Sequence, residues 1–411
     1  MTKCYLNDFG VVCSLGNTKQ QVKNALLADT QQEYLTENNQ LHHEGKSVFV
    51  GSVNSELPGL AHLAKPQQTR NNALALQALE QILPTIEQLK SEIVQSGIAQ
   101  PRIAVVIGTS TSGIAEGEQA RRFADSDDLA VIDANYHYQS QEMYAPAQFI
   151  AKFLGATGPV FSISTACSSS AKALASAQML LASDLADMVI CGGVDSLCKL
   201  TINGFSALES ISDTWCNPFG ENRDGINIGE AAALFVATKV TAKVSLLAAG
   251  ESSDAYHVSA PQPEGFGAIA AMRAALAQAN LSPDDIGYIN LHGTGTVKND
   301  QMESQAIFQL FGDQVPASST KRFTGHTLGA AGALEAGFCW LLLSEKSTTR
   351  LPINKMSAER DSALATIDLV IENNSEPRIQ KLNVCLSNSF AFGGNNISLI
   401  LAKHQLGKHN E

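Results

Sequence analysis

One cysteine in this sequence stands where a thiol can be reactive. Cys167 lies in the segment TACSSS, between a predicted buried strand and a predicted helix of small residues. A thiol at a helix start faces unpaired backbone N–H groups and the positive end of the helix dipole, which favour the thiolate. Its alanine and serine neighbours leave room for a substrate. A small core residue is the alternative role for a cysteine, so both interpretations remain open on this motif alone.

Two histidines occupy similar glycine- and threonine-rich turns in the second half. His292 ends a predicted strand in the segment HGTGT, and His326 precedes a predicted small-residue helix in the segment GHTLGAAG. Catalytic side chains commonly gather on such loops at strand and helix ends. A lone histidine is more often structural, whereas two in matching turns indicate a shared site. We therefore predict that Cys167, His292 and His326 converge on one pocket.

Further candidate residues accompany this set. Lys321 precedes His326 in the sequence, and Glu335 follows it among alanine, leucine and glycine residues. A carboxylate in such surroundings is expected to pair with a lysine or a histidine, although solvated surface charges are the alternative for both. The segment 390–396 contains two glycines, which permit a backbone path that presents an N–H group to an oxyanion. A hairpin with core aromatic residues is the alternative for that segment.

The composition is that of an ordered globular protein. The 411 residues are 44% hydrophobic and 17% charged, and the length suits two or three domains or one large composite. A net charge of −12 argues against nonspecific binding to nucleic acid or to an anionic membrane. The eight cysteines form no C-x-x-C pair and no zinc-like spacing with histidine, so we predict no metal. The start lacks a signal peptide and the apolar runs are short, so we expect a cytoplasmic protein without stable membrane insertion.

The order of predicted elements is typical of a layered α/β protein. Two α/β halves of related order, residues 1–240 and 241–411, meet near residue 240. Segments 30–65 and 115–150 are less periodic and are expected to be insertions or caps. The predicted strands are 102–108, 159–165, 188–192, 231–238, 286–291, 315–319, 383–386 and 397–402, and the predicted helices are 71–89, 168–183 and 329–344.

These motifs together resemble the β-ketoacyl-[acyl carrier protein] synthases, the elongating condensing enzymes of the thiolase superfamily. The resemblance spans nearly the whole chain. One cysteine with two histidines distinguishes this branch from the initiating synthases, which use Cys, His and Asn, and from degradative thiolases, which need a second catalytic cysteine. The five motifs occur in the family's order: TACSSS from 165, NPFGENRDGINIGEAA from 217, HGTGT from 292, STKRFTGHTLGAAGALEA from 319 and SNSFAFGGNN from 387.

The resemblance implies a five-layered αβαβα, thiolase-like fold made of two related halves. It implies that Cys167 carries the acyl chain as a thioester. His292 and His326 would then promote decarboxylation of malonyl-carrier and stabilise the enolate. The amides of Cys167 and Phe392 would hold the oxyanion, with Phe392 also acting as a gate. The remaining family positions are supporting residues Lys321 and Glu335, pantetheine contacts Thr294 and Thr296, and substrate-binding residues Phe390 and Thr111.

The same resemblance implies the partners and the alternatives. Substrates would arrive on the phosphopantetheine arm of an acyl carrier protein, with no cofactor bound, to a homodimer or a heterodimer with a chain-length factor. A noncatalytic chain-length partner and a CoA-dependent thiolase are alternatives, which the complete Cys-His-His set disfavours. Hydroxyl side chains in segment 108–113 indicate an unsaturated or oxygenated acyl chain, such as a polyene. The serines at 168–170 and Gly295 resemble the polyketide-type condensing enzymes, and the fatty-acid pathway stays open. Candidate docking cations are Lys65, Arg70, Arg121 and Arg122.

Overall fold

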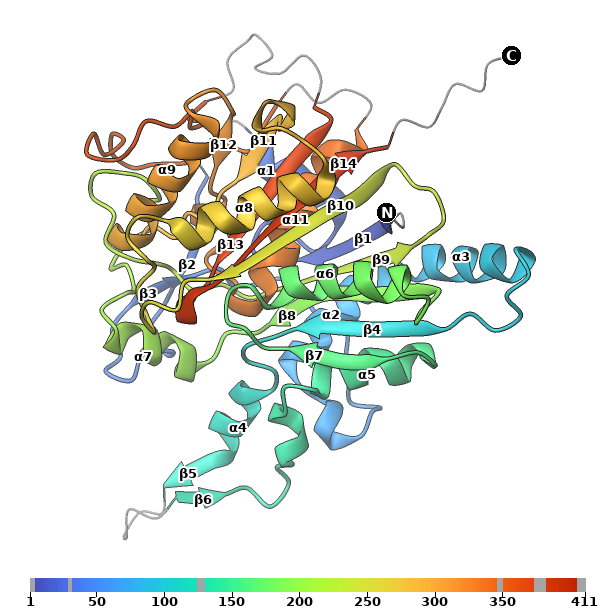
Figure 1. The fold of residues 1–411 in the computed structure, drawn as a ribbon. Coiled ribbons are helices and arrows are strands. Elements are labelled where there is room, and N and C mark those ends of the chain that lie inside the picture. Colours follow the sequence, from blue (N-terminus) through green and yellow to red (C-terminus); the bar gives the residue numbers. More distant parts are fainter. Residues whose placement is uncertain (1–3, 29–31, 124–129, 346–349, 373–381, 405–411) are drawn as a thin grey trace, which may run out of the picture.

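The structure is a computed structural model that describes residues 4–28, 32–123, 130–345, 350–372 and 382–404. Its main sheet has two halves of five strands each (Figure 1). The N-terminal half contains β1 (Cys4–Val12), β4 (Ile103–Gly108), β7 (Val160–Ile163), β8 (Met188–Asp195) and β9 (Ala231–Thr238). The C-terminal half contains β10 (Val244–Ser253), β11 (Tyr288–Asn290), β12 (Ala317–Ser318), β13 (Val384–Phe390) and β14 (Asn395–Lys403).

The two halves repeat one topology. The strand order is β7-β4-β8-β9-β1 in the first half and β12-β11-β13-β14-β10 in the second. In the first half β4 pairs in parallel with β7 and β8, and β9 pairs antiparallel with β8 and β1. In the second half β11 pairs in parallel with β12 and β13, and β14 pairs antiparallel with β13 and β10. The expectation of two related halves is confirmed.

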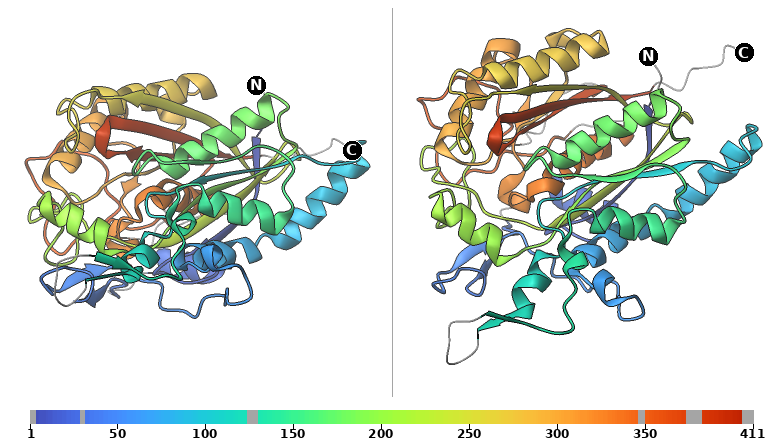
Figure 2. Two further views of the ribbon diagram at one scale, coloured as in Figure 1. Left: turned by 90° about the horizontal axis from the view of Figure 1, so that it is seen from below. Right: turned by 60° about the horizontal axis from the view of Figure 1, so that its bottom comes forward.

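Helices add three layers to the two half-sheets. The helices α6 (Ser169–Ala182) and α11 (Ala331–Ser344) lie between the half-sheets and pack on each other (Figure 1). The helix α11 is apolar or small on nearly all sides, as is usual for a helix buried all round, whereas α6 keeps one partly exposed face. The outer layers are α2 (Arg70–Glu80) with α5 (Ala145–Leu154), and α8 (Phe266–Ala279) with α9 (Val297–Phe311) (Figure 2). This is the expected αβαβα order.

The halves are joined edge to edge. Cys4 pairs with Leu246 and Tyr5 with Ser245, which links β1 to β10 in one continuous sheet. The central hydrophobic cluster contains residues of α6, α11 and both half-sheets. The boundary at residue 240 falls between β9 and β10, and the division into two domains there stays a prediction. No helix among the described residues is long and apolar enough to cross a membrane.

Some predicted elements are wrong in extent. The helix predicted at 71–89 is two helices, α2 and α3 (Leu83–Gln95), because Pro84 in the first turn of α3 starts a new helix. Segment 115–150 includes α5, which belongs to the repeated outer layer and is no insertion. Before α5, α4 (Ile114–Ala120) leads into a hairpin that projects from the body (Figure 1). The hairpin is formed by β5 (Arg121–Phe123) and β6 (Ala130–Ile132).

The remaining α-helices and strands are short and lie outside the ten-stranded sheet. They are α1 (Lys19–Leu26), β2 (Thr36–Asn38), β3 (Val48–Val50), α7 (Lys199–Ala207) and α10 (Lys321–Thr324). The sequence-based assignment missed β1, β10, α8 and α9. By contrast, the strand predicted at 231–238 coincides with β9.

Candidate active site

Cys167 stands in a sharp turn between β7 and α6. The preceding residue, Ala166, has φ of 53°, a left-handed conformation that is uncommon for a residue with a side chain. The Ser169 hydroxyl holds this turn, because it accepts the N–H of Thr165 at 2.9 Å and donates to the carbonyl of Ala166 at 2.6 Å. The turn places the sulfur beyond the end of the strand, in a buried position.

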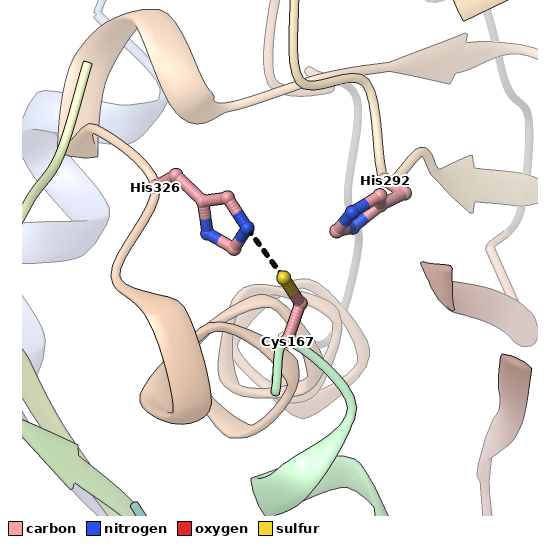
Figure 3. A group of neighbouring side chains, drawn as sticks. All are labelled: Cys167, His292 and His326. Atoms are coloured by element: carbon pink, nitrogen blue, oxygen red, sulfur yellow. Dashed lines mark hydrogen bonds between the residues drawn. The ribbon is translucent and has the colours of Figure 1, made fainter. Parts of the chain in front are cut away.

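The three predicted residues come together at the junction of the halves. Cys167 Sγ lies 2.8 Å from Nε2 of His326 (Figure 3). One ring nitrogen of each histidine and the sulfur all lie within 4.8 Å of one another. The two imidazole rings are 5.5 Å apart, centre to centre, and nearly perpendicular. A thiol from the first half and two imidazoles from the second therefore face one small space.

Backbone contacts fix the protonation of His326. Its Nδ1 accepts the N–H of Leu328 at 3.2 Å. The proton of the neutral ring is therefore on Nε2, which donates to Cys167 Sγ. Burial, and after it the charge of Lys321, lowers the pKa of His326 well below 6.5. The same two causes, with a smaller one from His326, lower the pKa of His292 well below 6.5, so both rings are neutral near pH 7.

The pKa of the Cys167 thiol is higher than its place at a helix start suggests. Burial raises the pKa of Cys167 to about 11. The charge of Lys321 and the backbone N–H of Phe392 act in the opposite direction. The amide of Cys167 itself also lowers the pKa. The role of the two amides as oxyanion donors stays a prediction. Formation of the thiolate thus depends on nearby donors, including His326 Nε2–H.

Lys321 and Glu335 form a buried ion pair behind the histidines. Lys321 Nζ lies 2.5 Å from Glu335 Oε1 and 2.5 Å from the carbonyl oxygen of His292. Both side chains are almost fully buried. Burial raises the pKa of Glu335, and Lys321 opposes that shift. The pairing expected from the sequence is present, and the ammonium group ties α10 and α11 to the backbone of His292.

Glu303 is a site residue that the sequence analysis missed. Its carboxylate accepts the N–H groups of His292 and Gly293, each at 2.7 Å. It is fully buried, and burial raises its pKa to about 8. The signal was present in the sequence, because Glu303 falls on the apolar face of a helical pattern with Met302 and Ile307. A carboxylate on such a face needs hydrogen-bond partners.

A pocket of about 290 Å³ opens onto the three residues. Its lining includes Thr294, Thr296, Phe390 and Phe392, as well as Cys167 and both histidines. The hydroxyls of Thr294 and Thr296 lie 3.0 Å apart at the pocket wall. Phe392 follows β13 in a turn where Gly393 has φ of 81°, and its ring lies 5.5 Å from that of Phe205. Three of the four predicted substrate-binding residues, and the predicted gate Phe392, therefore line the pocket that contains the thiol.

Thr111 lies elsewhere. It is fully buried, it is not part of the lining of this pocket, and its hydroxyl donates to Asp195 Oδ1 at 2.8 Å. Its substrate-binding role stays a prediction. Of the candidate docking cations, Lys65, Arg70 and Arg121 are exposed, and Arg70 also donates to the buried carboxylate of Glu230. The side chain of Arg122 lies outside the described residues.

The Cys-His-His group is also the one place where the described residues could hold a metal ion. Its three donor atoms are close enough to act as ligands together. Cysteine sulfur and histidine nitrogen are also the donors that bind zinc in sites with three protein ligands. The sequence-based prediction of no metal stays a prediction, which elemental analysis of the purified protein can check.

The fold and the site together define a Cys-His-His protein of the thiolase-like class. Two family models match the chain, the β-ketoacyl synthase N-terminal domain at residues 9–242 and the C-terminal domain at residues 244–351. The chain therefore belongs to the β-ketoacyl synthase family.

Relatives and solved structures agree with this assignment. The ketosynthase ApeO of Xenorhabdus doucetiae, solved in complex with its chain length factor ApeC, is 44% identical over 98% of both chains, with a TM-score of 0.88. A β-ketoacyl synthase structure from Burkholderia phymatum, 24% identical over 98% of this chain and 100% of that one, shares the fold with a TM-score of 0.81.

Two curated relatives match over part of their length. The 3-oxoacyl-[acyl-carrier-protein] synthase 2 of Rhizobium meliloti is 37% identical over 60% of this chain and 61% of that relative. Nodulation protein E of Rhizobium leguminosarum bv. trifolii is 38% identical over 62% and 64%. The aligned part thus spans just over three fifths of these relatives.

Proposed function

We propose that this chain is an elongating β-ketoacyl-[acyl carrier protein] synthase, an acyltransferase that extends an acyl chain by decarboxylative Claisen condensation. The observation that carries the proposal is the 2.8 Å contact of Cys167 Sγ with His326 Nε2, in a pocket that His292 also lines. A noncatalytic partner has no use for a buried thiol held in this geometry. The segment 390–396 contains no cysteine, which disfavours a thiolase.

The first half-reaction loads the enzyme. The thiolate of Cys167 attacks the thioester carbonyl of an acyl-carrier, and the carrier thiol leaves with a proton. We expect the amides of Cys167 and Phe392 to stabilise the oxyanion of the tetrahedral intermediate, since both N–H groups favour negative charge on the sulfur. Exchange between two thioesters costs little free energy, which suits a cysteine nucleophile.

The second half-reaction forms the carbon–carbon bond. Malonyl-carrier loses its carboxylate, and negative charge develops on the thioester oxygen of the enolate. The N–H groups of two neutral imidazoles, His292 and His326, stabilise that oxygen, and their low pKa values keep them neutral. The enolate carbon then attacks the acyl-Cys167 carbonyl, and the Cys167 thiolate leaves as the β-ketoacyl-carrier forms.

The substrates reach this site on the phosphopantetheine arm of the carrier, and the reaction needs no resident cofactor. Thr294 and Thr296 lie on the pocket wall, where their hydroxyls can bond the amides of the arm. Phe392 lines the same pocket as the thiol, which suits a gate between the half-reactions.

A second ketosynthase-like chain is the proposed partner. The edge strand β7 is half-exposed along its whole length, although its residues are mainly apolar. Its two covering helices expose Phe153 on α5 and Met179 on α6. The similar protein ApeO was solved with its chain length factor, which favours a heterodimer over a homodimer for this chain.

Reconstitution with a carrier protein tests the activity. Purified chain, with and without its coexpressed partner, is mixed with acyl-carrier and malonyl-carrier, and the carriers are analysed by intact mass spectrometry. We expect β-ketoacyl-carrier and an acyl adduct on Cys167, with saturated and polyene acyl chains compared in parallel. The Cys167→Ala variant should lose both products and still decarboxylate malonyl-carrier. If the native assembly gives neither the β-ketoacyl-carrier nor the acyl adduct on Cys167, the proposal is wrong.

A further inference from the structure

The nucleophile and its histidine belong to different halves of the molecule, so their 2.8 Å contact depends on how those halves are held together. Cys167 precedes α6, and His326 precedes α11. The two helices are the central layer and pack on each other. Their first turns meet beside the thiol, where Ser170 Oγ accepts the backbone N–H of Ala333 at 2.8 Å.

This hydrogen bond satisfies a group that the helix itself leaves unpaired. Ala333 is in the first turn of α11, where backbone N–H groups have no partner within the helix. Both Ser170 and Ala333 are fully buried, so water cannot replace the lost partner. A buried donor without an acceptor is costly, and the first turn of α11 would shift to recover one.

The surroundings of Ser170 leave it little freedom to move. A Cβ atom added at Gly193 would lie 2.5 Å from Ser170 Cβ and 3.0 Å from Ala330 Cα. The end of β8 therefore packs against both Ser170 and the turn before α11. A Cβ atom at Gly332 would lie 2.7 Å from Ala171 Cβ, which shows how closely the helices approach. Ser170 is thus a rigid bridge between the halves.

The bridged segment is the one that orients His326. The turn Leu328–Ala330 leads directly into α11, and its Leu328 N–H holds Nδ1 of His326. We infer that Ser170 is a positioning residue that holds His326 Nε2–H against the Cys167 sulfur. This inference rests on the proposed function, in which Cys167 is the nucleophile. Without the bridge, the Nε2–H donor moves away and the thiolate loses stabilisation.

Alkylation of the thiol by iodoacetamide tests the inference without any carrier substrate. In Ser170→Ala we expect the alkylation rate of Cys167 between pH 7.5 and 9 to fall about tenfold, since small displacements in a site have effects of this size or larger. The rate profile should shift to higher pH. Condensation should fall in parallel, and KM for the carrier should stay unchanged.

The controls separate positioning from general destabilisation. Ser176→Ala makes the same change on the half-exposed face of α6 and should leave alkylation and condensation as in the native protein. Ser170→Gly removes the same hydroxyl acceptor and should give the same alkylation profile as Ser170→Ala. Unfolding is measured for each variant.

The positioning role of Ser170 and the proposed function fail in different ways. A native-like alkylation profile in both folded Ser170 variants overturns the inference. An inactive native enzyme whose Cys167 nevertheless responds to Ser170 overturns the proposed function and leaves the positioning role intact.

Discussion

At the scale of single residues, the protein is stable only while the buried charges of Lys321 and Glu335 compensate each other. In Lys321→Met, Glu335 keeps a buried carboxylate without its cation, and we expect the free energy of unfolding to fall by about 3–5 kcal/mol. The double variant Lys321→Met/Glu335→Leu removes both charges and should recover most of that loss in urea unfolding. Condensation should remain impaired in both, because the His292 carbonyl has lost its donor. Equal stability of the two variants would contradict this account.

The histidines should remain functional in mildly acidic solution. Their pKa values lie well below 6.5, so lowering the pH through 6.5 leaves both rings neutral, in the form that the enolate requires. The Cys167→Ala variant isolates this step, because it decarboxylates malonyl-carrier without thiol chemistry. We expect its decarboxylation rate to be the same at pH 7.5 and pH 6.5. Two histidines of ordinary pKa would both be neutral in only about a quarter of the molecules at pH 6.5, and a fall in rate of that order would contradict the prediction.

The sequence was most informative where residue type itself limits the chemistry. A cysteine and two histidines, each in a turn of small residues, indicated one shared catalytic site, because few structural roles require these residue types in such turns. The contacts of Glu303 and Thr111 were beyond prediction, because they depend on how a buried carboxylate meets particular backbone N–H groups or hydroxyls. Burial also decides the pKa of Cys167, and burial depends on the whole fold.

At the scale of elements, α11 packs so closely on β1 that one of its glycines leaves no room for a side chain. A Cβ atom added at Gly337 would lie 2.0 Å from the ring of Phe9, which is itself stacked on Phe235 at 4.7 Å. We expect Gly337→Ala to lower the free energy of unfolding by about 1–3 kcal/mol, the usual cost of overpacking. Urea denaturation gives the value.

A matched glycine in another helix serves as the control for this prediction. Gly204 lies in α7, and a Cβ atom added there meets nothing within 4 Å. Gly204→Ala should therefore raise the free energy of unfolding by about 0.5–1 kcal/mol, because alanine loses less backbone entropy than glycine in a helix. A loss of stability in both variants would show that packing against Phe9 is not the cause in α11.

Element boundaries show why sequence patterns failed in places. Apolar spacing alone joined α2 and α3, and Pro84 was the local signal that separates them. The outer helix α8 was missed because its sequence is rich in alanine, which gives a weak contrast between apolar and polar faces. The buried strands β4, β8 and β9 were found because continuous apolar runs mark strands covered on both faces.

At the scale of the whole molecule, the repeated halves explain why the site lies where it does. Each half places a buried helix after its own parallel edge strand, β7 before α6 and β12 before α11. The starts of these two helices meet between the half-sheets, so one supplies the thiol and the other the imidazole of His326. The sequence predicted the two halves from the order of their elements, whereas the pairing of β1 with β10 that joins them required the structure.

The repeat also leaves β7 as an outer edge of the sheet. Charged residues introduced beside this edge should weaken association with a second chain. An apolar edge strand with exposed Phe153 and Met179 on its covering helices is a site for pairing with another chain. We expect Phe153→Lys/Met179→Lys to prevent assembly with a second ketosynthase-like chain, as followed by sedimentation velocity. Val94→Lys places the same charge on an equally exposed apolar position of α3 and should leave assembly unchanged. Native-like assembly of the double variant, or equal loss in the control, would place the interface elsewhere on the molecule.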